Sequence, residues 1–568
     1  MTKIRLTAFL ISAFAISFTA HAEDAEQTPS SPNSTDETTT KQKKQEAPVE
    51  LTGQVEQNTA AAVAKEEEAE EPGAPTPASP ATKANAEATT PPPEVKKPLF
   101  DAKKLKLKPL FSLKAHRESV DSFKVHSDGA VYDREPEDFL QLRLGLKARY
   151  DFVKNVFLKF NYEHDLISRR IAGGALTESD AFVRTDGVTP EETALRELNA
   201  EFRYKAAAVA TGFSVSNWGL GLLSNAGRGD WQSESAYFGS PYGGDRVYRT
   251  RAILGPIPSL KHLLFLVAYD TVIDDDILVA DDTANQLVTA IVMQPGQKNS
   301  AGIYAAFRSQ EHDNDRTTDV AAFDLFAQYS KTLTKNTTFS IAGEGALIVG
   351  ETDLGPNPTF PKHDVLQAGA LIRTKLSHKR LGFIGDLLYA SGDQNTDDDQ
   401  INNFRVDPNL ESGLILYRHV LNASTGHGPI AASDPDLVGY PSQDLERLAN
   451  NRSISNTISF FPRAWWKFSP ILETYGGVLF AFSEVSQIDP KNARLAGGQN
   501  RNAFDAEPGG YLGTEFDVGI RFTPKVGALK LNFGAEFGRF VFGDAFKNAD
   551  QTTPSSINAA RFYVRSTL

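Results

Sequence analysis

Basic side chains recur at every second position in several stretches of the chain, and this spacing is the clearest chemical signal in the sequence. In the segment from Phe139 to Phe152, Arg143, Lys147 and Arg149 alternate with leucine, alanine and tyrosine. A period of two places alternate residues on opposite faces of a β-strand. Rings of Arg and Lys around a water-filled space favour anions. The pattern therefore predicts an anion-binding inner surface formed by strands.

The same alternation along the other strands gives a set of basic candidates for this inner surface. They are Arg143, Lys147, Arg149, Lys159, Arg203, Arg249, Arg251, Arg373, Lys375 and Arg463. Acidic residues such as Glu163 and Glu201 share the same faces. A second interpretation is therefore that opposite charges pair between neighbouring strands and only fill a wet interior. Both interpretations remain open at this point.

Other chemistry is poorly represented in the sequence. The chain contains no Cys, which excludes disulfides, thiolate metal sites and a Cys nucleophile. His164, His312 and His363 each precede an Asp, but neighbours on a strand point to opposite faces, which does not suit a catalytic dyad. No Gly-rich phosphate motif or metal-ligand spacing is found. We therefore expect no enzyme, no cofactor and no bound metal.

The charge balance limits the partners further. The formal net charge is −13, which argues against nucleic-acid binding. Acidic clusters at 274–276, 281–282 and 397–399 could meet divalent ions at a lipopolysaccharide surface, although solvated loops are the simpler explanation.

The strands that carry the basic residues have the length and pattern of membrane strands. Two arms, 139–152 and 155–167, are joined by a tight turn, and each is long enough to cross a bilayer at a tilt. Lys or Arg on the lipid side would be costly, so the polar face should point inward; Phe157 is the one misfit on that face. The first strand, expected at Pro109–Arg117, is poorly defined, and the last is expected at Asn558–Leu568.

Repeated hairpins of this kind continue to the end of the chain and give roughly 18 strands. Short turns and long loops alternate along the chain, with long loops near 217–244 and 392–452. Outer-membrane barrels place short turns in the periplasm and long loops outside. The prediction is an all-β fold: a transmembrane antiparallel β-barrel of about 18 strands with both ends in the periplasm. Its expected partners are the lipid bilayer, lipopolysaccharide and the barrel-assembly machinery.

The N-terminal region is expected to have no part in the barrel. Residues 1–22 have the charged start, apolar core and Ala20-His21-Ala22 ending of a secretory signal peptide. Residues 23–104 are rich in Pro, Ala and Glu and predict a disordered periplasmic linker. The barrel itself is expected to span 105–568.

Two short segments resemble known outer-membrane families. LLYASGDQNTDDDQINNF (387–404) resembles the alginate-export family of outer-membrane porins, in which a strand ending in Tyr-Ala-(Ser/Thr)-Gly-Asp leads into an acidic loop and an aromatic residue. FSVSNWGLGLLSNAGRGD (213–230), followed by Asp245-Arg246, looks like a strand-to-loop segment of related, poorly characterised barrels. The resemblance implies a porin but assigns no substrate-contacting residue.

Together these features predict a porin-like channel through which anionic solutes or an acidic polysaccharide pass passively. The alternative is a structural or adhesive surface barrel whose lumen is closed by folded-in loops. The loop at 392–452 contains the apolar stretch Phe404–Leu421 and is long enough to fold inward as a constriction.

Overall fold

The computed structural model describes residues 101–173, 193–227, 231–239, 243–275, 277–278, 282–312, 315–353, 360–394, 398–410, 412–432, 450 and 452–568. The predicted signal peptide and the predicted linker up to residue 100 lie outside this part of the chain. The last residues assigned to the linker do take part in ordered structure. Ala102–Lys104 form a single 3-10 turn (η2), for which Asp101 is the N-cap.

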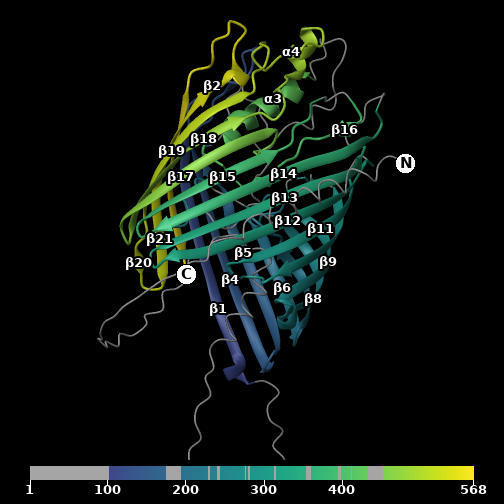
Figure 1. Ribbon diagram of the computed structural model, residues 1–568, viewed down its shortest axis with the longest axis vertical. Helices are drawn as coiled ribbons and strands as arrows, with labels where there is room; N and C mark the ends of the chain where they lie inside the picture. The colour runs from purple at the N-terminus through teal and green to yellow at the C-terminus, as the bar shows by residue number, and fades with distance from the viewer. Residues whose placement is uncertain are drawn as a thin grey trace, which may run out of the picture. The chain divides into compact units, whose positions relative to one another are not determined.

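Eighteen long strands form one closed antiparallel β-barrel, as predicted (Figure 1). The strands are β1 (Leu105–Val120), β4 (Glu137–Val153), β5 (Val156–Ala172), β6 (Ala194–Tyr204), β7 (Ala207–Val215), β8 (Arg246–Ile257), β9 (Leu263–Asp274), β10 (Thr283–Met293), β11 (Ser300–Glu311), β12 (Thr317–Thr334), β13 (Thr337–Thr352), β14 (His363–His378), β15 (Leu381–Ala390), β17 (Thr457–Ser469), β18 (Leu472–Phe482), β19 (Tyr511–Phe522), β21 (Leu529–Phe542) and β22 (Ile557–Thr567).

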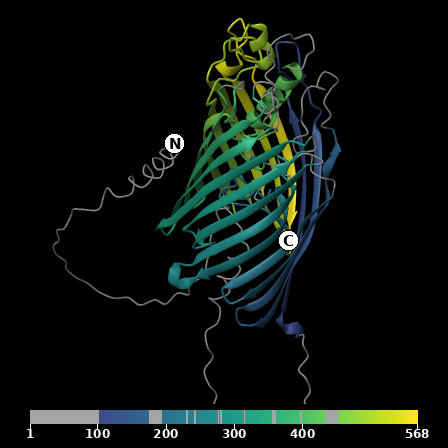
Figure 2. The same cartoon turned by 90° about the vertical axis from the view of Figure 1, so that its right-hand side faces the viewer.

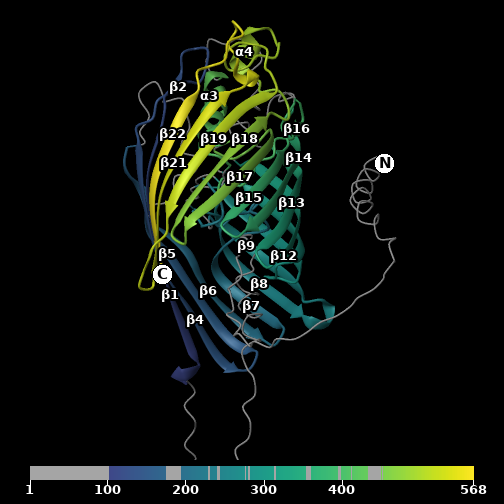
Figure 3. The same cartoon turned by 60° about the vertical axis from the view of Figure 1, so that its left-hand side comes forward.

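Each long strand pairs with its neighbour along the chain, and the ring closes between the first and the last strand. β1 pairs with β22 in the register Ser112↔Thr567 and with β4 in the register Ser112↔Arg143. Figure 3 shows β22 in yellow beside the blue strands at the start of the barrel. Closure leaves no unpaired sheet edge, which is the condition for strands to cross a bilayer.

The period of two sorts side chains between the outside and the inside of the barrel. In β12, Phe323 and Leu325 are exposed on the outer face, whereas Asp324 between them is buried inside. The same alternation of exposed apolar and buried polar residues is found all round the ring. An apolar belt outside and charges inside are the arrangement that a membrane requires.

The connections between strands differ in length between the two ends of the barrel. Tight turns such as 154–155 and 335–336 lie at one end, and longer connections lie at the other. The longer connections carry the small strands β2 (Phe123–Lys124), β3 (Val131–Tyr132) and β16 (Gln400–Ile401), and the helices η6 (Leu416–Leu421, a π-helix), α3 (Asn422–Ala432), α4 (Pro490–Leu495) and η8 (Asp544–Phe546). Figure 2 shows the helices α3 and α4 gathered at this loop end.

Several strand boundaries differ from the sequence-based prediction; β5, for example, ends at Ala172 rather than at 167. β1 begins at Leu105 rather than Pro109, because Leu105 and Leu107 continue the outward apolar row and pair with Tyr150 and Ala148 of β4. β17 begins at Thr457 rather than Ser453, since Ser455 instead forms an isolated bridge with Arg405 in the preceding loop.

Within the described residues, no helix has the length and apolar character needed to cross a membrane.

Candidate functional site: the basic wall and two inserted segments

One side of the barrel interior carries basic residues on three adjacent strands. We call this set the basic wall; it consists of Lys106 and Lys108 on β1, Arg143, Lys147 and Arg149 on β4, and Lys159 on β5. Like charges stand directly opposite one another in two rows, Lys108↔Lys147 in one and Lys106↔Arg149↔Lys159 in the other. Directly opposed like charges are destabilising in a sheet, so these rows favour an electrostatic role.

Acidic side chains lie among these cations. Arg143 makes a two-pronged contact with Asp165, with Nε to Oδ1 at 2.6 Å and Nη2 to Oδ2 at 2.9 Å. Lys147 lies 3.4 Å from Glu163. Asp151 is shared between Lys106 at 3.3 Å and Arg149 at 2.7 Å.

The inward-facing Phe157, the misfit in the sequence pattern, is explained by these cations. Its ring is buried, and the Arg149 guanidinium lies 4.0 Å from the ring centroid, with Lys159 Nζ at 5.0 Å and Arg203 at 6.0 Å. A ring face attracts cations, most strongly where water is excluded. Phe157 therefore gathers three of the predicted basic residues at one place.

The other predicted basic residues lie on the inward face but in tighter surroundings. Arg249 pairs with Asp270 through two contacts of 2.7 Å, and both side chains are buried. Arg373 and Arg463 both bond Asp386. Arg203 Nη1 donates to the Gly255 carbonyl. These pairs match the interpretation in which charges fill the interior.

The remaining two predicted residues are also buried. Arg251 lies 3.9 Å from Glu201, and Lys375 lies over the Trp465 ring with its ammonium 5.0 Å from the centroid. The ten predicted residues thus divide into a partly exposed group, formed by those on β4 and β5 together with Arg373 on β14, and a buried group elsewhere on the inner face.

Two loop segments fold into the barrel. The first inserted segment comprises 217–227 and 231–239, between β7 and β8. Trp218 Nε1 donates to Asp324 at 2.6 Å, and the backbone amides of Leu220 and Leu222 donate to Glu344. Gly219 between them has φ +52°, and a Cβ there would collide with the Glu344 carboxylate. The Trp-Gly-Leu-Gly motif is therefore the anchor of this segment on β12 and β13.

Farther along, the first inserted segment reaches the opposite wall. Trp231 stacks on Tyr563 with ring centroids 4.1 Å apart and an interplanar angle of 4°. The Glu234 amide donates to Glu473, and Phe238 packs against Tyr475. The segment thus contacts β12 and β13 near its start and β18 and β22 near its end.

The second inserted segment comprises 402–410 and 412–427, between β16 and β17. Phe404 is fully buried against Gly369 of β14, where a Cβ would collide with its ring. The amides of Leu414, Ile415 and Leu416 all donate to the Glu515 carboxylate of β19. The stretch Phe404–Leu421, for which the sequence allowed an inward constriction, therefore lies inside the barrel in a largely apolar cluster.

His419 links this segment to the β1–β4 connection. Its Nδ1 lies 2.9 Å from the Tyr132 hydroxyl, and its Nε2 lies 3.2 Å from Glu118. Burial lowers the pKa of His419 to about 4, and the neighbouring Glu118 offsets this only in part. The imidazole is therefore neutral at pH 7 and contributes hydrogen bonding rather than charge.

Comparisons with known proteins give structural neighbours only. No protein-family model and no curated protein matches the sequence. Among solved structures, Pseudomonas aeruginosa OccK5 (OpdH) shares 11% identity with a TM-score of 0.42, covering 81% of this chain and 98% of that one. Acinetobacter baumannii OccAB1 shares 11% identity with a TM-score of 0.44, covering 82% of this chain and 96% of that one. A BenF-like porin from Pseudomonas fluorescens Pf-5 shares 12% identity with a TM-score of 0.44, covering 81% of this chain and 98% of that one. No family assignment follows from these values.

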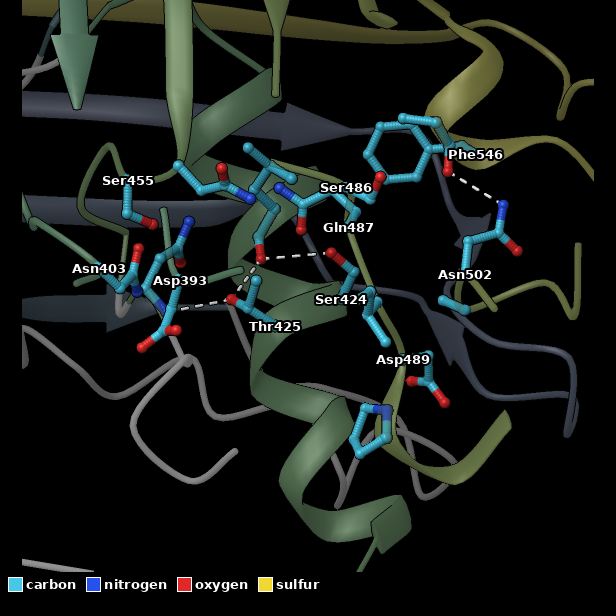
Figure 4. Close-up of a pocket in the computed structure, with 17 residues that line it drawn as sticks. Asp393, Asn403, Ser424, Thr425, Ser455, Ser486, Gln487, Asp489, Asn502 and Phe546 are labelled. Carbon is cyan, nitrogen blue, oxygen red and sulfur yellow. Dashed lines mark hydrogen bonds between the residues drawn. The ribbon is translucent and has the colours of Figure 1, made fainter. Parts of the chain in front are cut away.

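The loop end of the barrel contains a small cavity of about 80 Å³ between α3, α4 and η8. Figure 4 shows Ser424 and Thr425 of α3 facing it, with Asp489 at its side and Asn502 and Phe546 across from them. The backbone amide of Asn450 donates a hydrogen bond to Thr425 Oγ1 at 3.1 Å, and Asn502 Nδ2 donates one to the Ala545 carbonyl at 3.0 Å. The first bond lies within the β16–β17 connection, and the second joins the β18–β19 connection to the β21–β22 connection.

Sequence reasoning missed Lys106 and Lys108, because the first strand was expected to begin after them. The alternation of Leu105, Lys106, Leu107 and Lys108 was the available signal. The acidic clusters at 274–276, 281–282 and 397–399 lie partly outside the described residues; of their members, Asp275 pairs with Arg308 and Asp282 with His312.

Proposed function

We propose that this protein is an outer-membrane channel through which small anionic solutes pass along the basic wall. The apolar outer belt and the closed ring of strands support the membrane location. The basic wall supports the preference for anions, since fixed cations can replace part of the hydration of a carboxylate or phosphate through weak successive contacts.

The observation that carries this proposal is the partial exposure of inward-facing cations. The side chain of Lys147 is 30% exposed and that of Arg149 is 17% exposed. Both point into the barrel, so the space that they face is internal. In contrast, Arg203 and Arg249 on other strands are 1% exposed. Water therefore reaches Lys147 and Arg149, and also Arg373, whose side chain is 17% exposed, but not Arg203 and Arg249.

The inserted segments favour small solutes over a polymer. They cross the interior from β12–β14 to β18, β19 and β22, so a solute that passes through the barrel must pass beside them. Passage of an acidic polysaccharide, the second substrate class expected from the sequence, is the narrower variant of the proposal and needs these segments to move.

Charge reversal at Lys147 tests the proposal directly. We expect Lys147→Glu to move the reversal potential of single channels, recorded in a planar bilayer under a KCl gradient, toward cation selectivity. Lys335→Glu makes the same change of charge in the exposed β12–β13 turn and should leave the reversal potential unchanged. Equal reversal potentials in wild type and Lys147→Glu would show that the basic wall does not line the path.

A closed surface barrel is the second candidate, and the inserted segments are the observation that favours it. The buried cluster formed by Phe404, Leu414–Leu416 and their neighbours is what a permanent plug would contain. Bilayer recording separates the two candidates, because a plugged barrel gives no conductance steps at any voltage that the bilayer tolerates.

A further inference from the structure

Two histidines and two aspartates from three separate loops meet at the loop end of the barrel. His126 and Asp128 lie in the β1–β4 connection, His427 lies in α3, and Asp489 is the N-cap of α4. The two imidazole rings have centroids 4.9 Å apart, and both side chains are almost fully buried. None of the four lies in a membrane-spanning strand, and none takes part in the basic wall.

Three of these residues present ligand atoms to a common point. One ligand atom each from His126, Asp128 and His427 lies within 4.8 Å of the other two. Asp128 Oδ1 is 3.0 Å from Nδ1 of His126, and Asp128 Oδ2 is 3.1 Å from Nε2 of His427. Zinc–ligand bonds of about 2.0–2.2 Å place neighbouring ligands of a tetrahedron roughly 3.3 Å apart. The two His–Asp separations, which involve different oxygens of Asp128, are close to that value, and the ligand atoms of the two histidines lie within 4.8 Å of each other.

Asp489 stands where a supporting carboxylate would be expected. Its Oδ1 lies 3.1 Å from Nε2 of His126, the ring nitrogen on the side away from Asp128. A metal-binding imidazole usually donates its other N–H to a carboxylate or carbonyl, which fixes the ring and its tautomer. Asp489 is itself held by the Asn492 amide at 2.9 Å, so it can act as a rigid positioning residue.

We propose that Nδ1 of His126, a carboxylate oxygen of Asp128 and Nε2 of His427 bind one divalent transition-metal ion of the zinc class. Three protein ligands leave one tetrahedral position for water. The Asp128 amide, 3.1 Å from Nδ1 of His126, and the Lys491 ammonium, 3.6 Å from Asp128, must withdraw when the ion enters. The bound ion joins the β1–β4 connection to α3, and Asp489 extends that link to α4.

Titration of the full chain tests this site. Zinc chloride is added to the detergent-purified barrel, freed of any polyhistidine tag, and binding is followed by calorimetry. We expect one zinc ion per chain. His126→Ala and His427→Ala should each weaken binding by at least ~30-fold, and Asp489→Asn by about 10-fold, the range found for supporting residues. His262→Ala, at an exposed histidine of the β8–β9 turn, is the matched control and should bind as wild type does.

The wild-type protein provides the second measurement, in case a variant does not fold. X-ray absorption at the zinc edge should show nitrogen and oxygen ligands only, with the scattering of two imidazoles. The absence of saturable zinc binding, unchanged binding in the His126→Ala/His427→Ala double variant, or equally tight binding of magnesium would each overturn the proposal. None of these outcomes depends on channel conductance, so the site and the proposed function can fail separately.

Discussion

At the scale of single residues, Phe157 shows what a broken pattern can mean. The sequence predicts its strand correctly from the neighbouring alternation, but an aromatic residue on the polar face has no explanation there. The cations that surround it come from β4, β5 and β6. Their positions depend on strand register, which one sequence does not supply. The face of each basic residue was therefore predictable, but its exposure and its partner were not.

Replacing Phe157 measures what this cluster contributes. Phe157→Leu keeps an apolar side chain of similar size but removes the ring face, so we expect a loss of about 1–2 kcal/mol in the free energy of unfolding. Urea unfolding of the barrel in lipid vesicles, followed by tryptophan fluorescence, gives the value. Phe160→Leu is the control, because Phe160 lies on the exposed outer face of the same strand. Equal effects of the two substitutions would contradict a specific cation–ring contribution.

At the scale of elements, the strands follow from the sequence and the inserted segments do not. Strand identity depends on local alternation, so the arm expected at 139–152 lies within two residues of β4 at each end. The inserted segments are held by contacts with distant residues, such as Leu416 with Glu515 and Leu222 with Glu344. The length and apolar character of 404–421 showed only that the segment could fold inward.

Glu515 is the residue whose change should release the second inserted segment. The Glu515 carboxylate accepts hydrogen bonds from three backbone amides. Glu515→Gln leaves only one acceptor oxygen, so we expect a loss on the order of 1–3 kcal/mol in the free energy that holds the segment in place. We expect faster tryptic cleavage at Arg405 and Arg418 and a larger single-channel conductance. Glu311→Gln, at the exposed end of β11, should change neither. Unaltered cleavage in Glu515→Gln would show that the segment is held by its apolar contacts alone.

At the scale of the whole barrel, depth in the membrane should decide the cost of an outward charge. Leu325 lies near the middle of β12 and Leu333 near its end, and both are exposed on the same outer face. We expect Leu325→Arg to lower the free energy of unfolding by about 2–4 kcal/mol and Leu333→Arg by about 0–1 kcal/mol. Folding titrations in vesicles measure both. Equal costs would contradict the position of the bilayer around this belt.

The pairing of β1 with β22 has a consequence for how the protein is made. The two halves of this seam are the first and the last long strands of the chain, joined in the register from Val120↔Ala559 to Ser112↔Thr567. The barrel can close only after β22 has reached the membrane and paired with β1. Until then, the two edge strands of the open sheet have unpaired backbone groups that can bond to any other extended chain. We therefore expect the two open edges to need shielding until β22 pairs with β1.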